Sequence, residues 1–152
     1  MDSLHEGWRA CRYFGNLDLL IDYSPEAQAL FKAISGARPN RGYELYFKEG
    51  ITYSLVATGG FSARYMPPGF IFDAGGPCVS PSKASLRYVL GFLNSALVRY
   101  FLRILNPTIN CQPNDISRVP YVPPDAETER NINALVRQAI ETRKGILKTD
   151  EM

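Results

Sequence analysis

The feature that most constrains the fold is an apolar stripe with helical spacing between residues 86 and 105. Its members are three or four positions apart, so they share one face of a helix: Leu86, Leu90, Leu93, Leu97, Phe101 and Ile104. Ser82 or Ser85 can cap this helix, and Asn106-Pro107 ends it. The sequence therefore predicts a helix over residues 85–105 whose apolar face needs a partner.

Residues 43–80 are rich in aromatic and β-branched side chains and are interrupted by glycines, a composition typical of short strands. Polar and apolar side chains alternate over residues 43–48 and 61–65. Turns are expected at three points: Gly59-Gly60, Pro67-Pro68-Gly69 and Gly75-Gly76-Pro77. We expect three or four strands that form, with residues 116–122, a small, curved, mainly antiparallel sheet packed on the central helix.

Two further helices are expected outside this core. After a candidate strand at residues 17–23, Ser24-Pro25 opens a helix of about ten residues that ends near Gly36. Asp125 caps a last helix that ends near Lys144-Gly145. The predicted fold class is α+β. Its parts are an N-terminal strand and helix in the same domain (1–42), a core (43–124), and a C-terminal helix and tail (125–152).

Bulk composition excludes several classes of protein. At 152 residues, with 45% hydrophobic and 21% charged side chains, the chain suits one globular domain. No apolar run reaches the roughly 18 residues of a membrane span, and the first residues lack the pattern of a signal peptide. These observations predict a cytoplasmic protein with no membrane partner.

Residues that carry catalysis or bind metals are scarce. The three cysteines, Cys11, Cys78 and Cys111, are widely spaced and are expected to be free thiols, and His5 is the single histidine. The glycine clusters fit neither a phosphate loop nor a dinucleotide fingerprint. We therefore expect no catalytic residue, no metal site and no cofactor in this chain.

Charge is unevenly distributed, although the net charge is only +2. Residues 51–118 carry six basic side chains against two acidic ones, Asp73 and Asp115, so this part would attract phosphate. Candidate phosphate contacts are Lys48, Lys83, Arg99 and Arg103, and candidates for hydrogen bonds to base edges are Thr52, Ser54, Arg64, Asn110, Gln112 and Asn114. An ordinary solvated basic face, and a loop whose amides bond its own backbone, are open alternatives.

An ordered set of short motifs resembles one protein family. The set comprises Lys48-Glu49-Gly50-Ile51-Thr52-Tyr53-Ser54, Gly60-Phe61-Ser62-Ala63-Arg64, Gly69-Phe70-Ile71-Phe72-Asp73, Leu90-Gly91-Phe92-Leu93-Asn94-Ser95, Ile104-Leu105-Asn106-Pro107-Thr108-Ile109-Asn110, Asp115-Ile116 and Val119-Pro120. Together they resemble the C-terminal part of adenine-specific DNA methyltransferases of the BREX phage-defence type, also called type II restriction enzyme methylase subunits. The arrangement is also similar to the recognition domains of type I restriction specificity subunits.

The resemblance implies a DNA target-recognition domain that lacks the catalytic half. The family's F-x-G-x-G cofactor loop and [NDS]-P-P-[YF] catalytic motif are absent here, since Asn106-Pro107-Thr108 lacks the second proline and the aromatic residue. Methyl transfer and S-adenosylmethionine binding would belong to the parent protein. Implied partners are double-stranded DNA and the parent's methyltransferase domain, and a homodimer is a further candidate assembly.

Two rival interpretations belong to other classes of protein. A protein-interaction module would dock through the last helix or the far side of the central helix, onto the methylase core, a partner subunit or a second copy. An enzyme fragment would have a pocket that is completed by residues outside the chain. DNA recognition predicts affinity that falls steeply with salt, whereas docking predicts a large exposed apolar patch.

Overall fold

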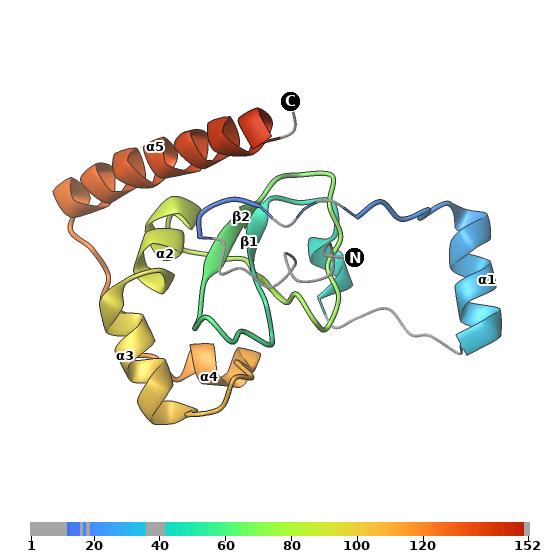
Figure 1. Cartoon of the computed structure of the whole chain (residues 1–152), viewed down its shortest axis with the longest axis horizontal. Coiled ribbons are helices and arrows are strands. Elements are labelled where there is room, and N and C mark those ends of the chain that lie inside the picture. The colour runs from blue at the N-terminus through green and yellow to red at the C-terminus, as the bar shows by residue number, and fades with distance from the viewer. Residues whose placement is uncertain (1–11, 16, 18, 36–41, 151–152) are drawn as a thin grey trace.

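The computed structural model describes residues 12–15, 17, 19–35 and 42–150. Its elements are, in chain order, α1 (Pro25–Ser35), the 3-10 helix η2 (Tyr43–Leu45), β1 (Gly50–Tyr53), β2 (Ala63–Met66), β3 (Cys78–Val79), α2 (Leu86–Leu93), α3 (Ala96–Leu105), α4 (Pro113–Ser117) and α5 (Ala126–Asp150). Figure 1 shows the sheet between α2 and the long connections, with α5 along the outer side of α2 and α1 far from the rest. The predicted α+β class is confirmed.

A small antiparallel sheet forms the centre, in the order β2-β1-β3. β1 is buried along its whole length, because β2 and β3 flank its edges and the helices cover its face. The hairpin between β1 and β2 turns at Gly60, whose φ of +85° favours glycine. Residues 43–48 form no strand, which corrects the prediction from alternation: η2 occupies 43–45, and Tyr46 and Phe72 stack edge to face at 5.0 Å.

The central helix is broken, which corrects the prediction of one helix over 85–105. α2 and α3 meet at 61°, because Ser95 caps a new helix by accepting a hydrogen bond from the Val98 amide at 3.2 Å. After the bend, Val98 and Leu102 face the core, whereas Leu97 and Ile104 of the predicted stripe are exposed. The stripe therefore belongs to two helices with different buried faces.

Close packing joins α2 to α5. A β-carbon at Gly91 would lie 3.0 Å from the side chains of both Ile132 and Val136, so the missing side chain sets the distance between the helices. Val136 and Ile140 are buried, and Ile132 is partly buried against the same core, as the predicted stripe requires. α5 continues to Asp150, past the end expected at Gly145.

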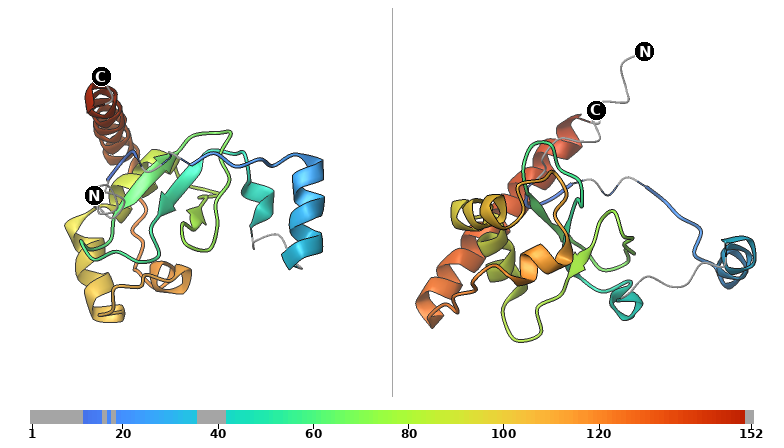
Figure 2. Two further views of the ribbon diagram at one scale, coloured as in Figure 1. Left: turned by 45° about the vertical axis from the view of Figure 1, so that its right-hand side comes forward. Right: turned by 90° about the horizontal axis from the view of Figure 1, so that it is seen from below.

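The outer segments correct two further predictions and confirm a third. Residues 19–23 form no strand, and Leu19 and Leu20 are 92% and 100% exposed. Residues 116–122 do not join the sheet: α4 takes residues 113–117, and an extended stretch follows. The helix at Pro25–Ser35 is confirmed, but Figure 2 shows it standing away from the domain. The expected stop at Gly36 lies outside the described residues, as do Cys11 and His5.

Candidate functional site

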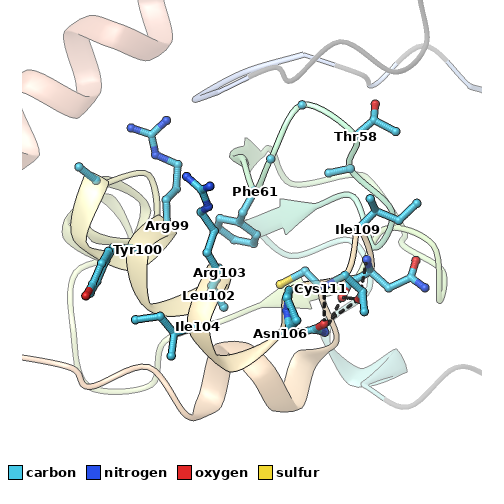
Figure 3. A pocket seen from close by; sticks show the side chains of 17 residues that line it. Thr58, Phe61, Arg99, Tyr100, Leu102, Arg103, Ile104, Asn106, Ile109 and Cys111 are labelled. Atoms are coloured by element: carbon cyan, nitrogen blue, oxygen red, sulfur yellow. Dashed lines mark hydrogen bonds between the residues drawn. The ribbon is translucent and has the colours of Figure 1, made fainter.

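A hollow of about 840 Å³ lies between α3, the tip of the β1–β2 hairpin and the loop after α3. Figure 3 shows Arg99 and Arg103 side by side on α3, next to Phe61, with Thr58 on the wall across from them. The floor is apolar, because Phe61 and Leu102 are both buried. The hollow thus combines an apolar base with a charged wall.

The two arginines give the hollow its charge. None of the 17 lining residues is acidic, so Arg99 and Arg103 contribute two positive charges that no lining carboxylate offsets. Within the described part of the chain, neither guanidinium is in an ion pair, and the Nε of Arg99 is buried without a hydrogen-bond acceptor. A buried donor without an acceptor carries a free-energy cost that an anionic ligand would relieve.

The loop after α3 is held rigid by Asn106. Its side-chain amide donates to Asp115 Oδ2 at 2.7 Å and to the Asn110 carbonyl at 2.6 Å. Its side-chain oxygen accepts from the Thr108 hydroxyl at 2.6 Å. Asp115 Oδ2 also accepts a hydrogen bond from the backbone amide of Gln112 at 2.9 Å, which ties the start of α4 to the same carboxylate. The loop's shape is therefore fixed before any ligand arrives.

This network also sets the ionisation of Asp115. The side-chain hydrogen bond from Asn106, and then the backbone hydrogen bond from Gln112, hold the pKa of Asp115 below its ordinary value of 3.8. Burial and the nearby Asp115 carboxylate raise the pKa of the Cys111 thiol to about 11. Cys111 lines the hollow and is a free thiol, as is Cys78, and this thiol stays protonated at neutral pH.

The hairpin tip is fastened to the same loop. The Ala57 amide donates to the Ile109 carbonyl at 2.9 Å, and the Cys111 amide donates to the Leu55 carbonyl at 2.7 Å. These bonds flank an isolated antiparallel bridge between Val56 and Asn110. Two walls of the hollow are thus joined by backbone hydrogen bonds.

The structure gathers some of the predicted contact residues and separates others. Arg99, Arg103 and Asn110 line the hollow, and the side chains of Gln112 and Asn114 are exposed nearby, at the start of α4. Lys48 and Lys83 are exposed but are not among the residues that line it. Three of the ten candidates therefore share the hollow itself.

The other three candidates face inward. Arg64 is 5% exposed, and its two terminal nitrogens each donate to Ser54 Oγ at 3.2 Å. Thr52 is buried, and its hydroxyl donates to the Gly76 carbonyl at 3.1 Å. In this conformation Thr52 and Arg64 are out of reach of a DNA base, and Ser54 is occupied by the arginine.

Sequence reasoning missed Thr58, Asn106 and Asp115 as parts of the site. Asn106 was interpreted as the end of a helix and as part of a family-like motif, and no local pattern links it to Asp115, nine residues on. The described residues contain no group of three or more His, Cys, Asp or Glu side chains that could hold a metal ion. No single helix in that part of the chain is long and apolar enough to cross a membrane. Taken together, α2 and α3 have the length and composition of a membrane span, but a 61° bend separates them.

Two curated proteins are similar to the chain. The adenine-specific methyltransferase BrxX of Escherichia coli O9:H4 (strain HS) is 32% identical over 142 residues, which cover 91% of this chain and 11% of that protein. The adenine-specific methyltransferase PglX of Lacticaseibacillus casei (strain Zhang) is 31% identical over 115 residues, which cover 72% of this chain and 10% of that protein. No protein-family profile matches the sequence.

The chain thus spans about a tenth of the length of these two relatives. It is homologous to a short segment of these adenine-specific methyltransferases, in agreement with the resemblance that the sequence motifs carry. The activity in the names of these relatives is that of proteins much longer than this chain, because the matched segment is only about a tenth of either one.

Proposed function

We propose that this chain is the DNA target-recognition segment of an adenine-specific methyltransferase of a phage-defence or restriction-modification system. It would bind double-stranded DNA and position a target adenine for a catalytic domain that lies outside the chain. The observation that carries the proposal is the acid-free hollow with Arg99 and Arg103 on one wall. Homology to adenine-specific methyltransferases supports it.

The two arginines are suited to contacts with phosphate. They lie one turn apart on α3, so both guanidinium groups can approach the same stretch of sugar-phosphate backbone. Lys48 and Lys83 are exposed at other points of the surface and remain candidates for outlying phosphate contacts. Phosphate contacts fix the register of a protein on a duplex, but they do not read its sequence.

Base reading is assigned to the exposed amides beside the hollow. Asn110, Gln112 and Asn114 are exposed on a loop and helix start whose backbone is held by Asn106 and Asp115. Amide side chains can pair with adenine, and a rigid backbone lowers the entropy lost on binding. Thr52, Ser54 and Arg64 then support the sheet beneath the hollow, because Thr52 and Arg64 are buried.

Catalysis is assigned elsewhere. In this proposal the chain itself is not an enzyme, and S-adenosylmethionine binding and methyl transfer belong to the rest of a full-length methyltransferase. The partners are therefore DNA and the methyltransferase domain, and the localisation is cytoplasmic. The prediction of a homodimer is retained as a separate question for sedimentation analysis.

Fluorescence anisotropy with a short random-sequence duplex tests the proposal. We expect binding that weakens steeply between about 50 and 200 mM salt. The double variant Arg99→Ala, Arg103→Ala should bind more weakly and should reduce the slope of log K against log salt by about 2, since each phosphate contact contributes about 0.9.

The matched control is Arg130→Ala, Arg137→Ala. These two exposed arginines lie on α5, so the control removes the same charge from a different surface. It should leave the salt slope nearly unchanged. Absence of binding by the wild-type chain at low salt, or an equal loss in both double variants, would contradict recognition through α3.

A second candidate function, docking onto a methyltransferase, is favoured by one specific observation. Leu30, Phe31 and Ile34 of α1 are 57%, 47% and 75% exposed, and their spacing places them on one face of the helix. An exposed apolar helix face is typical of a protein-protein interface. The rival interpretation from sequence placed docking on the last helix or the far side of the central helix. Val136 and Ile140 of the last helix are buried in the domain's own core, whereas Leu97 and Ile104 of α3 are exposed.

A further inference from the structure

The tip of the β1–β2 hairpin, opposite α3, is a tight turn at the edge of the hollow. Ala57 and Gly60 close a tight turn, in which the Gly60 amide donates to the Ala57 carbonyl at 3.3 Å. Thr58 and Gly59 lie between them and are exposed. Among the described residues, the amides of Thr58 and Gly59 and the Thr58 hydroxyl have no hydrogen-bond acceptor. The tip thus carries free donors on residues that line the hollow, and Figure 3 shows Thr58 on the opposite side from the two arginines.

Gly60 leaves room for a close approach to the turn. A β-carbon at Gly60 would meet no heavy atom within 4 Å, so the space beside the turn is open. Glycine at a ligand-facing turn lets backbone amides reach an anion that a side chain would hold away. The positive φ of Gly60 also favours glycine at this position of the turn.

The two walls are set at a fixed spacing. The hydrogen bonds from Ala57 to Ile109 and from Cys111 to Leu55 fasten the tip to the loop after α3, and Asn106 holds that loop in turn. Donors held in place lose little entropy when a ligand binds. At about 840 Å³, the hollow falls within the roughly 300 to 1,000 Å³ of pockets for drug-sized ligands, so it has room for more than one isolated ion.

We propose that the hollow is a clamp for the phosphodiester backbone of one DNA strand. Arg99 and Arg103 hold phosphate from the α3 side, and the hydroxyl of Thr58 with the amides of Thr58 and Gly59 donates to it from the tip. The apolar floor at Phe61 and Leu102 lies beneath the sugar carbons. This assignment rests on the proposed DNA recognition and adds a second wall of contacts to it.

Thr58→Glu tests the clamp, because it places a negative charge on the exposed tip without touching α3. We expect duplex affinity to fall about tenfold or more, since the variant loses a donor to a charged group and adds repulsion. The control Gln138→Glu makes the same charge change on exposed α5 and should alter affinity by less than about twofold, because a distant surface charge is screened by salt.

Two further measurements keep the clamp distinct from DNA binding in general. The nuclear magnetic resonance signals of the Thr58 and Gly59 amides should shift when duplex is added. A duplex with uncharged methylphosphonate linkages along the middle of one strand should bind more weakly than its unmodified form.

The outcomes separate the two proposals. If the wild-type chain binds DNA with the expected salt dependence, but Thr58→Glu behaves like Gln138→Glu or the amide signals do not move, the clamp is wrong and DNA recognition stands. Equal affinity for the methylphosphonate duplex also overturns the clamp. If the wild-type chain binds no duplex, both proposals fail together.

Discussion

Asn94 pairs with the backbone of Ala63 in both directions. Its side-chain oxygen accepts from the Ala63 amide at 3.0 Å, and its side-chain nitrogen donates to the Ala63 carbonyl at 2.9 Å. Asn94 therefore bonds to the start of β2 much as a neighbouring strand would. It does so from the point where α2 ends and α3 begins, so one buried side chain joins the helix bend to the sheet.

Replacing Asn94 by leucine should destabilise the whole domain. The Ala63 amide would be left buried without an acceptor, at a cost of about 1–3 kcal/mol, although the Ala63 carbonyl would keep the Tyr13 amide as a donor at 2.9 Å. Urea denaturation followed by circular dichroism measures the loss. Asn106→Leu, in the exposed loop, is the comparison: it should change the loop more than the sheet. Unchanged stability of Asn94→Leu would contradict the role assigned to this pair.

Two glycines in helices should respond in opposite directions. Gly91→Leu adds a side chain where even a β-carbon would lie only 3.0 Å from Ile132 and Val136, so we expect about 1–3 kcal/mol of destabilisation from overpacking. Gly145→Ala on α5 meets nothing within 4 Å and should stabilise by about 0.5–1 kcal/mol through helix propensity. Thermal unfolding of both variants compares them. A stabilised Gly91→Leu would show that α2 and α5 are not packed closely.

Asp115 should make stability depend on pH in the acid range. Its folded pKa lies below the ordinary 3.8, so its contribution is fully present above that value and is lost as pH falls through the folded pKa. Asp115→Asn removes this contribution. The free-energy difference between wild type and variant should be constant from about pH 5 to 7 and shrink below about pH 4.

Chemical denaturation at several pH values measures that difference. Asp125→Asn is the control, because Asp125 also has a lowered pKa, from hydrogen bonds with the Thr128 backbone amide and hydroxyl, but it caps α5 away from the hollow. Only Asp115→Asn should also change the shape of the loop that Asn106 and Asp115 hold. A difference between wild type and Asp115→Asn that grows as pH falls would have the wrong sign and would contradict the hydrogen-bonded carboxylate.

Much of the fold follows from local patterns, and the failures have a common physical cause. Helical spacing located α2 and α3 together, but it did not show the bend, at which Ser95 caps α3 and Asn94 bonds Ala63, 31 residues away in sequence. Alternation over residues 61–65 located β2, but the equally alternating residues 43–48 form no strand, and Tyr46 there packs edge to face against Phe72. Local sequence carries periodicity, but it does not carry the tertiary partner that breaks the period.

The candidate site was predictable to a similar extent. Arg99 and Arg103 were recognised as neighbours because they lie one helical turn apart. That they face a hollow without an acidic residue depends on three segments meeting, and that Arg64 points inward depends on Ser54 across the hairpin. Residue chemistry thus selected plausible DNA contacts, but tertiary structure decides which of them solvent can reach.

The exposed face of α1 gives the last prediction. Leu30→Glu, Ile34→Glu should change the stability of the isolated chain by less than about 0.5 kcal/mol, because both side chains are largely exposed there. Only about a tenth of this chain lies outside the match to BrxX, and that is fewer residues than the 24 that precede α1. The segment that is homologous to BrxX therefore includes α1. Nine tenths of BrxX therefore lies outside the matched segment and is available to cover this face.

A chimera tests this expectation, with the chain placed in BrxX in exchange for the matching segment. If α1 docks on the methyltransferase, the double variant should lower the thermal stability of the chimera while leaving the isolated chain unchanged. Leu135→Glu on α5, where the side chain is 65% exposed, is the control and should affect neither protein. If the chimera with the double variant is as stable as the chimera without it, the apolar face has no role in docking. That result would not bear on DNA binding through Arg99 and Arg103, because α1 lines no part of the hollow.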